Sequence, residues 1–318
     1  MMTGGEAMMA CGGTDRRPEF ERNGALSEVL AELNGALTAT GDAVVRRYSA
    51  PQRPVVLVMG CPRSGTTLTF QWLASLGFFS YPTNLLSRFY AAPHVGALVQ
   101  RMLTDPALQF RDELLPALAA PAFRSALGKT TGILSPNEFW FFWRRHFEQP
   151  AGPWLPPGPC LDAARLLAEL AALEAGLEGR PMAFKGLMFN WQIPALDRLL
   201  PRAVFLNVQR DPLANMASLL AARQRFAGDT GCWYSYKPPE LDGAEPRGPQ
   251  EQVAAQVALT RAAVTRGLAA VRSDRCLTVN YETLCSDPVS VYDALRIRLE
   301  AQGFIPPPAY SGPARFAA

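Results

Sequence analysis

A short apolar run followed at once by a glycine-bracketed polar loop constrains the fold of this chain more than any other stretch. Residues 55–59 are all apolar, the loop runs from Gly60 to Gly65, and Thr66 and Thr67 come next. An uninterrupted apolar run of this length is typical of a strand buried on both faces, as in a parallel sheet. A helix beginning just after the loop, expected over residues 68–76, would direct its unpaired backbone amides at a ligand. Together with the Arg63 guanidinium, these groups predict a phosphate or sulfate site.

The spacing of the two glycines matches the first half of the P-loop of nucleoside-triphosphate enzymes, but the second half differs. Thr66 stands where that motif has its lysine, and the cation lies inside the loop, at Arg63. A planar guanidinium suits bidentate contact with an oxyanion better than an ammonium group does.

The rest of the chain predicts an α/β fold around this motif. Further buried strands are expected at residues 182–185, 203–208 and 276–281, and helical patterns separate them. Residues 93–147 read as a helical insertion cut into short pieces by prolines, and a short strand is expected within residues 78–90. We therefore expect a three-layer domain with a central parallel sheet and P-loop-like topology over residues 20–318. The polar, glycine-rich residues 1–19 are expected to form a disordered tail.

Cations follow three of the expected strands. They are Arg63, Lys185 and Arg210, and Ser218 comes eight residues after Arg210, on the next expected helix. The carboxyl ends of parallel strands meet at one edge of a sheet, which is where such folds bind ligands. Three cations at one edge would repel each other, so the pattern favours a ligand with several negative charges.

Composition narrows the range of partners. The net charge is only +3 over 318 residues, which gives no support for a nucleic-acid partner. No apolar run is long enough to span a bilayer, and the N-terminus lacks the apolar segment of a secretory signal. The six cysteines include no CxxC pair, so neither a zinc site nor a redox motif is predicted. These features favour a cytoplasmic protein with reduced thiols.

Several of these motifs resemble those of the sulfotransferases that use 3′-phosphoadenosine 5′-phosphosulfate (PAPS). Residues 62–68, Pro-Arg-Ser-Gly-Thr-Thr-Leu, resemble the 5′-phosphosulfate loop in the arginine form found in tyrosylprotein and many bacterial sulfotransferases. Arg210-Asp211-Pro212 with Ser218 resembles the 3′-phosphate motif, and Lys185 stands where the family has a catalytic lysine. Tyr281-Glu282-Thr283-Leu284, followed by Asp287-Pro288, resembles the segment near the adenosine. The resemblance extends in the same order from Val55 to Pro288.

This resemblance implies transfer of a sulfuryl group from PAPS to a hydroxyl or amine, with adenosine 3′,5′-bisphosphate as product and no metal. The acceptor would be a small molecule, a glycan or a lipid. Arg63 and Lys185 would stabilise charge on the transferring group, by analogy with phosphoryl transfer. The expected donor-binding residues are Arg63, Ser64, Gly65, Thr66, Thr67, Arg210, Ser218 and Tyr281.

The general base is where the sequence departs from the family. Leu187 occupies the position at which some members have a histidine, and residues 83–85 contain no carboxylate where others have a glutamate. The candidates are Glu138, His146 and His94, of which Glu138 is favoured because it heads the aromatic stretch 139–147. A carboxylate against aromatic walls is desolvated, which suits a base near neutral pH.

Other interpretations remain open at this point. A P-loop kinase or nucleotide hydrolase would need a metal ligand, for which Asp211 is available. A nucleotide-binding protein without catalysis would explain the missing histidine and early glutamate. The aromatic stretch fits a buried core or an apolar substrate wall equally well. The long loop 228–248 is either a lid or a surface loop.

Overall fold

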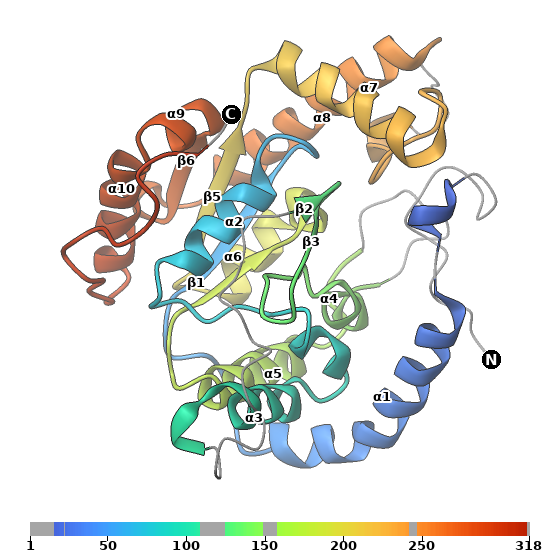
Figure 1. The fold of residues 1–318 in the computed structure, drawn as a ribbon. Helices are drawn as coiled ribbons and strands as arrows, with labels where there is room; N and C mark the ends of the chain where they lie inside the picture. The colour runs from blue at the N-terminus through green and yellow to red at the C-terminus, as the bar shows by residue number, and fades with distance from the viewer. Residues whose placement is uncertain (1–15, 22, 109–124, 149–157, 242–246, 317–318) are drawn as a thin grey trace.

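The computed structural model describes residues 16–21, 23–108, 125–148, 158–241 and 247–316. At its centre lies a four-stranded parallel sheet with the strand order β4-β1-β5-β6 (Figure 1). Its strands are β1 (Val55–Gly60), β4 (Met182–Lys185), β5 (Val204–Gln209) and β6 (Cys276–Asn280). Val58 pairs with Lys185 on one side and with Leu206 on the other, so β4, β1 and β5 end almost level. The predicted parallel sheet is confirmed.

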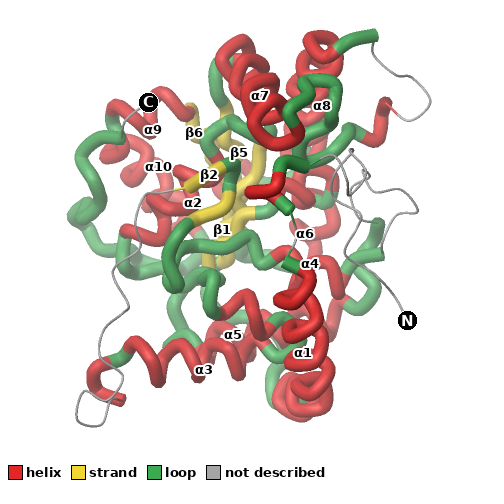
Figure 2. The backbone as a smooth tube through the Cα atoms, turned by 45° about the vertical axis from the view of Figure 1, so that its right-hand side comes forward, coloured by secondary structure: helices red, strands yellow, loops and turns green. Residues whose placement is uncertain are grey.

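Helices cover both faces of this sheet, as the predicted three-layer arrangement requires (Figures 1 and 2). One face carries α4 (Trp140–His146), α5 (Ala163–Gly176), α6 (Ile193–Leu199) and α8 (Pro249–Leu268). The other face carries α2 (Thr66–Ser75) and α10 (Pro288–Ala301). Successive residues of β1 point to opposite sides, so Leu57 packs into the first core and Val58 into the second. Burial on both faces explains why this strand is apolar throughout.

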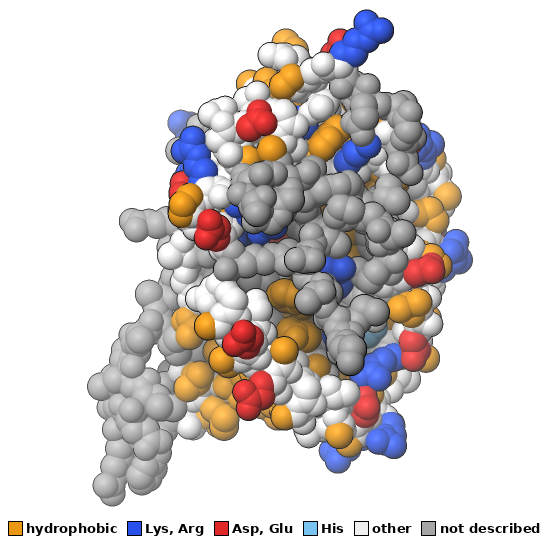
Figure 3. Space-filling model, turned by 90° about the vertical axis from the view of Figure 1, so that its right-hand side faces the viewer, with side chains coloured by type: hydrophobic (Ala, Val, Ile, Leu, Met, Phe, Trp, Pro, Cys, Tyr) orange, Lys and Arg blue, Asp and Glu red, His pale blue; other side chains and the backbone are white. Residues whose placement is uncertain are grey.

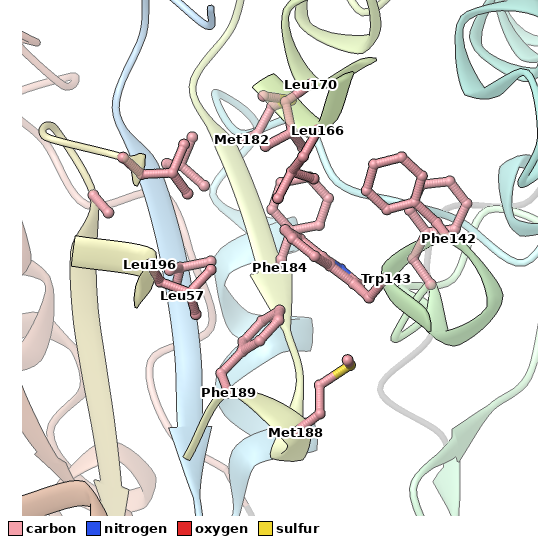
Figure 4. Close-up of a cluster of buried hydrophobic side chains, with 14 of the residues drawn as sticks. Leu57, Phe142, Trp143, Leu166, Leu170, Met182, Phe184, Met188, Phe189 and Leu196 are labelled. Carbon is pink, nitrogen blue, oxygen red and sulfur yellow. The ribbon is translucent and has the colours of Figure 1, made fainter. Parts of the chain in front are cut away.

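Some residues of the aromatic stretch 139–147 belong to the hydrophobic core. Phe142 and Trp143 are fully buried and pack towards Phe184 of β4, together with Leu166 and Leu170 of α5 (Figure 4). The Trp143 ring lies edge-on to Phe184, with 5.1 Å between the ring centroids. Trp140 and Phe141 on the same helix are not buried. The core interpretation therefore holds for Phe142 and Trp143, whereas the substrate-wall interpretation of Trp140 and Phe141 stays a prediction.

Side-chain caps define where several helices begin. Asn23 accepts a hydrogen bond from the first turn of α1 (Gly24–Val45), and Asp162 does the same for α5. Asp211 caps α7 (Pro212–Ala227), and Asp287 caps α10, each with proline at the first helical position. A side-chain acceptor satisfies an otherwise unpaired amide, and proline has none to satisfy. Asp211 thus has a structural role at the start of α7.

The region expected to be a helical insertion contains a hairpin as well as helices. It comprises α3 (Pro93–Thr104), the antiparallel pair β2 (Ser125–Ala126) and β3 (Lys129–Thr130), and α4; residues 109–124 lie outside the described residues. The expectation of helix throughout is wrong at 125–130, because Leu127 and Gly128 both have positive φ and form a tight turn. The short strand expected within residues 78–90 does not form either, and Ser80 makes only an isolated bridge to Met182.

The remaining elements are short. A further helix, α9 (Tyr281–Ser286), follows β6 directly. The 3-10 segments are η1 (Pro18–Phe20), η2 (Leu86–Phe89), η3 (Pro106–Leu108), η4 (Leu187–Trp191), η5 (Pro239–Leu241) and η6 (Ser273–Arg275).

Most of the tail predicted over residues 1–19 lies outside the described residues, which begin at residue 16. The Arg17 amide donates to the carbonyl of Phe226, and the Phe20 ring lies 5.4 Å from the Phe226 ring. This contact attaches the start of the described chain to α7. Among the helices that the structure describes, none is long and apolar enough to cross a membrane.

Candidate active site

A cavity of about 1020 Å³ opens at the carboxyl edge of the sheet. Each strand of the sheet is followed closely by a residue that lines it: Arg63 after β1, Lys185 at the end of β4, Arg210 after β5 and Tyr281 after β6. This is the edge at which parallel α/β sheets bind ligands. The three cations predicted to meet at one edge therefore do line one cavity.

The loop after β1 is held in place from neighbouring elements. Asn190 of η4 accepts a hydrogen bond from the Gly60 amide at 3.0 Å and donates to the Gly60 carbonyl at 2.9 Å. Asn215 of α7 donates to the Pro62 carbonyl at 2.8 Å. The buried Ser64 hydroxyl donates to Val208 of β5 at 3.1 Å, so it anchors the loop and is already engaged. Such anchoring allows Arg63 to hold a left-handed backbone conformation, with φ of 67°.

The loop leads directly into the N-terminus of α2. Thr66 and Thr67 occupy its first positions, and both line the cavity. The amides of a first helical turn have no intrahelical acceptor, and the helix dipole favours negative charge there. This end of the cavity is therefore suited to an anion.

Gly65, at the N-cap of α2, is a position in this loop that requires glycine. Its φ of 99° lies in the left-handed region, and a Cβ atom there would overlap the Tyr281 ring. Tyr281 in turn lies under Arg210, whose guanidinium carbon is 4.6 Å from the ring centroid. The close approach of loop and ring therefore sets the position of Arg210.

We expect Gly65→Ala to lower the free energy of unfolding by about 1–3 kcal/mol more than Gly77→Ala does, measured by urea denaturation. Gly77 is the matched control, because its φ is also positive, at 78°, but a Cβ atom added there would have no neighbouring atom within 4 Å. Equal losses in the two variants would show that the contact with Tyr281 is unimportant.

Arg63, Ser218 and Arg210 form a connected group behind the loop. Arg63 Nε donates to Ser218 Oγ at 3.3 Å, and Arg210 donates to the Arg63 carbonyl at 3.4 Å. Ser218 is half-buried and contacts Arg63, although it does not line the cavity. The structure thus brings together the residues of the two expected phosphate motifs.

Lys185 and Glu138 form an ion pair inside the cavity. The Lys185 side chain is only 3% exposed, whereas that of Glu138 is 27% exposed. Glu138 precedes α4, and its position is fixed by the next residue, Phe139, which has a φ of 55° and donates its amide to Asn137 at 2.8 Å. The favoured base candidate and the expected catalytic lysine are therefore neighbours.

The two histidine candidates lie elsewhere. Neither His94 nor His146 is among the cavity-lining residues that the structure describes. His146 is buried against Glu169, with 3.1 Å between Nε2 and Oε2. Burial opposes ionisation of Glu169, but the His146 hydrogen bond and the Arg145 charge hold the pKa of Glu169 below its usual range. His94 is buried with both ring nitrogens unpartnered among the described residues, and burial lowers its pKa.

The hairpin and the long loop meet over the cavity. Tyr234 of the loop donates its hydroxyl to the carbonyl of Leu127 at 2.7 Å, and both residues line the cavity. Burial raises the pKa of Tyr234 to about 12, against the opposing effect of Arg63, so the phenol stays protonated and keeps this bond at neutral pH. Residues 242–246 of the loop lie outside the described residues.

Sequence reasoning missed Asn190, Asn215 and the hairpin turn, and it identified Tyr234 only as part of the long loop 228–248. The two asparagines act on backbone groups 130 and 153 residues away, so no local pattern marks them. The Leu-Gly pair at 127–128 was the available signal for the hairpin, since turns of this kind need a residue that tolerates positive φ. Within the described residues, no group of three or more His, Cys, Asp or Glu side chains is arranged to hold a metal ion.

These features define a class: an α/β protein with a glycine-bracketed loop and a helix N-terminus after its first strand and an ion-paired lysine and glutamate in the same cavity. The chain belongs to the sulfotransferase family, an enzyme family whose model matches residues 54–302. No curated protein matches the sequence.

Solved bacterial sulfotransferases have a similar fold. Sulfotransferase STF1 from Mycobacterium tuberculosis H37Rv is 15% identical, with a TM-score of 0.52 over 87% of this chain and 77% of that one. Sulfotransferase STF9 from Mycobacterium avium is 13% identical, with a TM-score of 0.50 over 91% of this chain and 76% of that one. At such identities the similarity concerns the fold.

Proposed function

We propose that this enzyme transfers the sulfuryl group of PAPS to a hydroxyl, or an amine, of an acceptor that enters the same cavity. The observation that carries the proposal is the convergence of Arg63, Lys185, Arg210 and Glu138 on one cavity at the carboxyl edge of the sheet. A donor with phosphates at both ends of its ribose needs cations at two separate places. Arg63 with the α2 N-terminus suits the 5′-phosphosulfate, and Arg210 beside the Tyr281 ring suits the 3′-phosphate and adenosine.

The chain's own residues account for each part of the transfer. The acceptor oxygen forms a bond to sulfur while the bond from sulfur to the 5′-phosphate oxygen breaks, and adenosine 3′,5′-bisphosphate leaves with that electron pair. Lys185 and Arg63 stabilise the charge that develops on the leaving oxygen and the sulfuryl oxygens. Glu138 takes the proton of the acceptor hydroxyl. Without a donor, Lys185 keeps its buried charge neutralised by Glu138.

We expect the protein to bind adenosine 3′,5′-bisphosphate roughly 10- to 100-fold more tightly than AMP, because hydrogen bonds to a charged group are worth about 1.5–3 kcal/mol. Isothermal calorimetry without added metal measures both affinities. Arg210→Ala should abolish the preference, and Arg202→Ala should keep it. Arg202 is the matched control because it precedes β5 at the opposite edge of the sheet and donates to the Gln52 carbonyl.

Equal affinity for the two nucleotides would contradict the assignment of Arg210 to the 3′-phosphate. Magnesium-dependent turnover of a nucleoside triphosphate would favour the kinase or hydrolase interpretation instead.

A further inference from the structure

The outer part of the cavity is built differently from the part that suits the donor. Its lining residues come from α1, from η2 with the residue before it, and from α4, and not from the β1 loop. Its walls are formed by Leu26, Leu30, Leu85, Arg88, Trp140 and Phe141. We call these residues the outer wall. Contacts between α1 and η2, such as the bond from Asn34 Nδ2 to the Arg88 carbonyl at 2.8 Å, hold two of its sides together.

The outer wall leaves apolar surface uncovered. Leu26 is 38% exposed and Phe141 is 48% exposed, and Ile133, which also lines the cavity, is 40% exposed. Phe141 packs on one side against Tyr90, with 5.3 Å between ring centroids, which fixes its orientation. Elsewhere on this side of the molecule, charged side chains of both signs are interspersed (Figure 3). Uncovered apolar groups in a concave site favour a ligand with an apolar body.

One cation of the outer wall has no partner. Among the described residues, the half-buried Arg88 side chain makes neither a hydrogen bond nor an ion pair. Other arginines of this region are paired: Arg145 and Arg165 both bind Glu169, at 2.9 and 3.0 Å. The cavity lining that the structure describes contains one carboxylate, Glu138, and Lys185 occupies it. Arg88 therefore faces the cavity without an anion from the described chain to neutralise it.

The charged groups of the proposed donor have other partners and do not explain the unpaired charge of Arg88. The phosphates and sulfuryl group of PAPS are matched by Arg63, Lys185 and Arg210, which follow the strands of the sheet. Arg88 belongs to η2, within the outer wall and next to α1. Its natural partner is an anionic group on the acceptor, because a guanidinium binds carboxylate or phosphate in a bidentate manner.

We propose that the acceptor is an amphipathic anion: a molecule with an apolar body that packs on the outer wall, a carboxylate or phosphate that binds Arg88, and a hydroxyl that reaches Glu138 and Lys185. This inference rests on the proposed function, since it describes the acceptor of the same transfer. The hydroxyl becomes a sulfate ester, its proton passes to Glu138, and adenosine 3′,5′-bisphosphate is released.

The test compares acids with their neutral esters. The probes are 12-hydroxydodecanoate and a hydroxylated steroid carboxylate, each beside its methyl ester, with a hydroxyalkyl phosphate as the second anion. Calorimetry in the presence of saturating adenosine 3′,5′-bisphosphate measures binding, and labelled PAPS measures kcat/KM. At least one anion should bind roughly tenfold more tightly than its neutral counterpart, with kcat/KM higher by a similar factor.

Variants assign that preference to one residue. Arg88→Gln should abolish the discrimination between acid and ester without altering affinity for adenosine 3′,5′-bisphosphate, whereas Arg88→Lys should retain much of it. Arg202→Gln is the control, because Arg202 lies at the opposite edge of the sheet. Lys129→Gln, which changes a second cation of the cavity lining that the structure describes, should leave the discrimination intact.

The possible results distinguish a failure of this inference from a failure of the proposed function on which it rests. Equal binding of acids and esters, no binding of any anion, or loss of discrimination in Lys129→Gln but not in Arg88→Gln would each overturn the inference. Tight binding of adenosine 3′,5′-bisphosphate together with equally efficient transfer to neutral acceptors would overturn the inference about the acceptor and leave the proposed function in place. Failure to bind that nucleotide would overturn both.

Discussion

Replacing Lys185 with methionine should lower kcat by roughly 100- to 1,000-fold, the range found when a preorganised donor to a developing negative charge is removed. Lys185 ends β4 and is almost fully buried, so its ammonium group is held at the cavity by the sheet itself. Methionine retains the apolar stem that packs in this position and removes only the charge. Initial rates with labelled PAPS, together with thermal unfolding followed by circular dichroism, separate the loss of catalysis from any loss of stability.

The control for this substitution is Lys237→Met, which changes a lysine that is not among the described residues lining the cavity. It should leave kcat within about twofold of the unchanged enzyme, as expected of a substitution outside the cavity lining. A Lys185→Met enzyme that keeps its rate would remove the charge-stabilising role assigned to this lysine.

Replacing Glu138 with glutamine should lower kcat by roughly 100- to 10,000-fold, the usual contribution of a positioned general base. Glutamine keeps the shape of the side chain and still offers Lys185 an acceptor, but it cannot take a proton. The loss should therefore fall on kcat, while affinity for adenosine 3′,5′-bisphosphate changes little. Rates at saturating donor and calorimetry with that product measure the two effects.

A variant with a shorter side chain at position 138 tests the same role by chemical rescue. Glu138→Ala removes the carboxylate and leaves space, so added formate should restore part of the rate. Glu178→Gln is the matched control, because Glu178 is also ion paired, with Arg180 at 2.7 Å, but lies on the surface. Full activity in Glu138→Gln would show that Glu138 is not the general base. Another group would then take the proton, or the acceptor would need no base.

The elements that sequence predicted well are those with a strong local pattern. The four strands of the sheet and the helices around them are confirmed, with ends that differ by a few residues. Apolar runs mark strands buried on both faces, and Asp with Pro marks the starts of α7 and α10. The hairpin at 125–130 was missed because its strands are two residues long, too short for any periodicity to register.

The candidate site followed from the sequence only where its residues belong to contiguous motifs. Arg63, Thr66 and Thr67 lie in one short stretch of the chain, and the carboxyl ends of parallel strands meet at one edge of the sheet, which brings in Lys185 and Arg210. No such rule selects between three possible bases. In the structure Glu138 lies at the cavity beside Lys185, whereas His146 is engaged with Glu169, and this difference is why we propose Glu138 as the base.

The loop between Gly60 and Gly65 shows most clearly which features the sequence determines and which depend on the tertiary structure. The sequence by itself determined that a buried strand leads into a glycine-bracketed loop and a helix, because burial and backbone conformation act over a few neighbouring residues. Only the tertiary structure decided what holds this loop: Asn190 on Gly60, Asn215 on Pro62, and Tyr281 against Gly65. It also decided that Arg88 lines the same cavity as Arg63, Lys185 and Arg210. Contacts across 130 or more residues depend on how the sheet and its helices pack, and packing leaves no periodic signal in the chain.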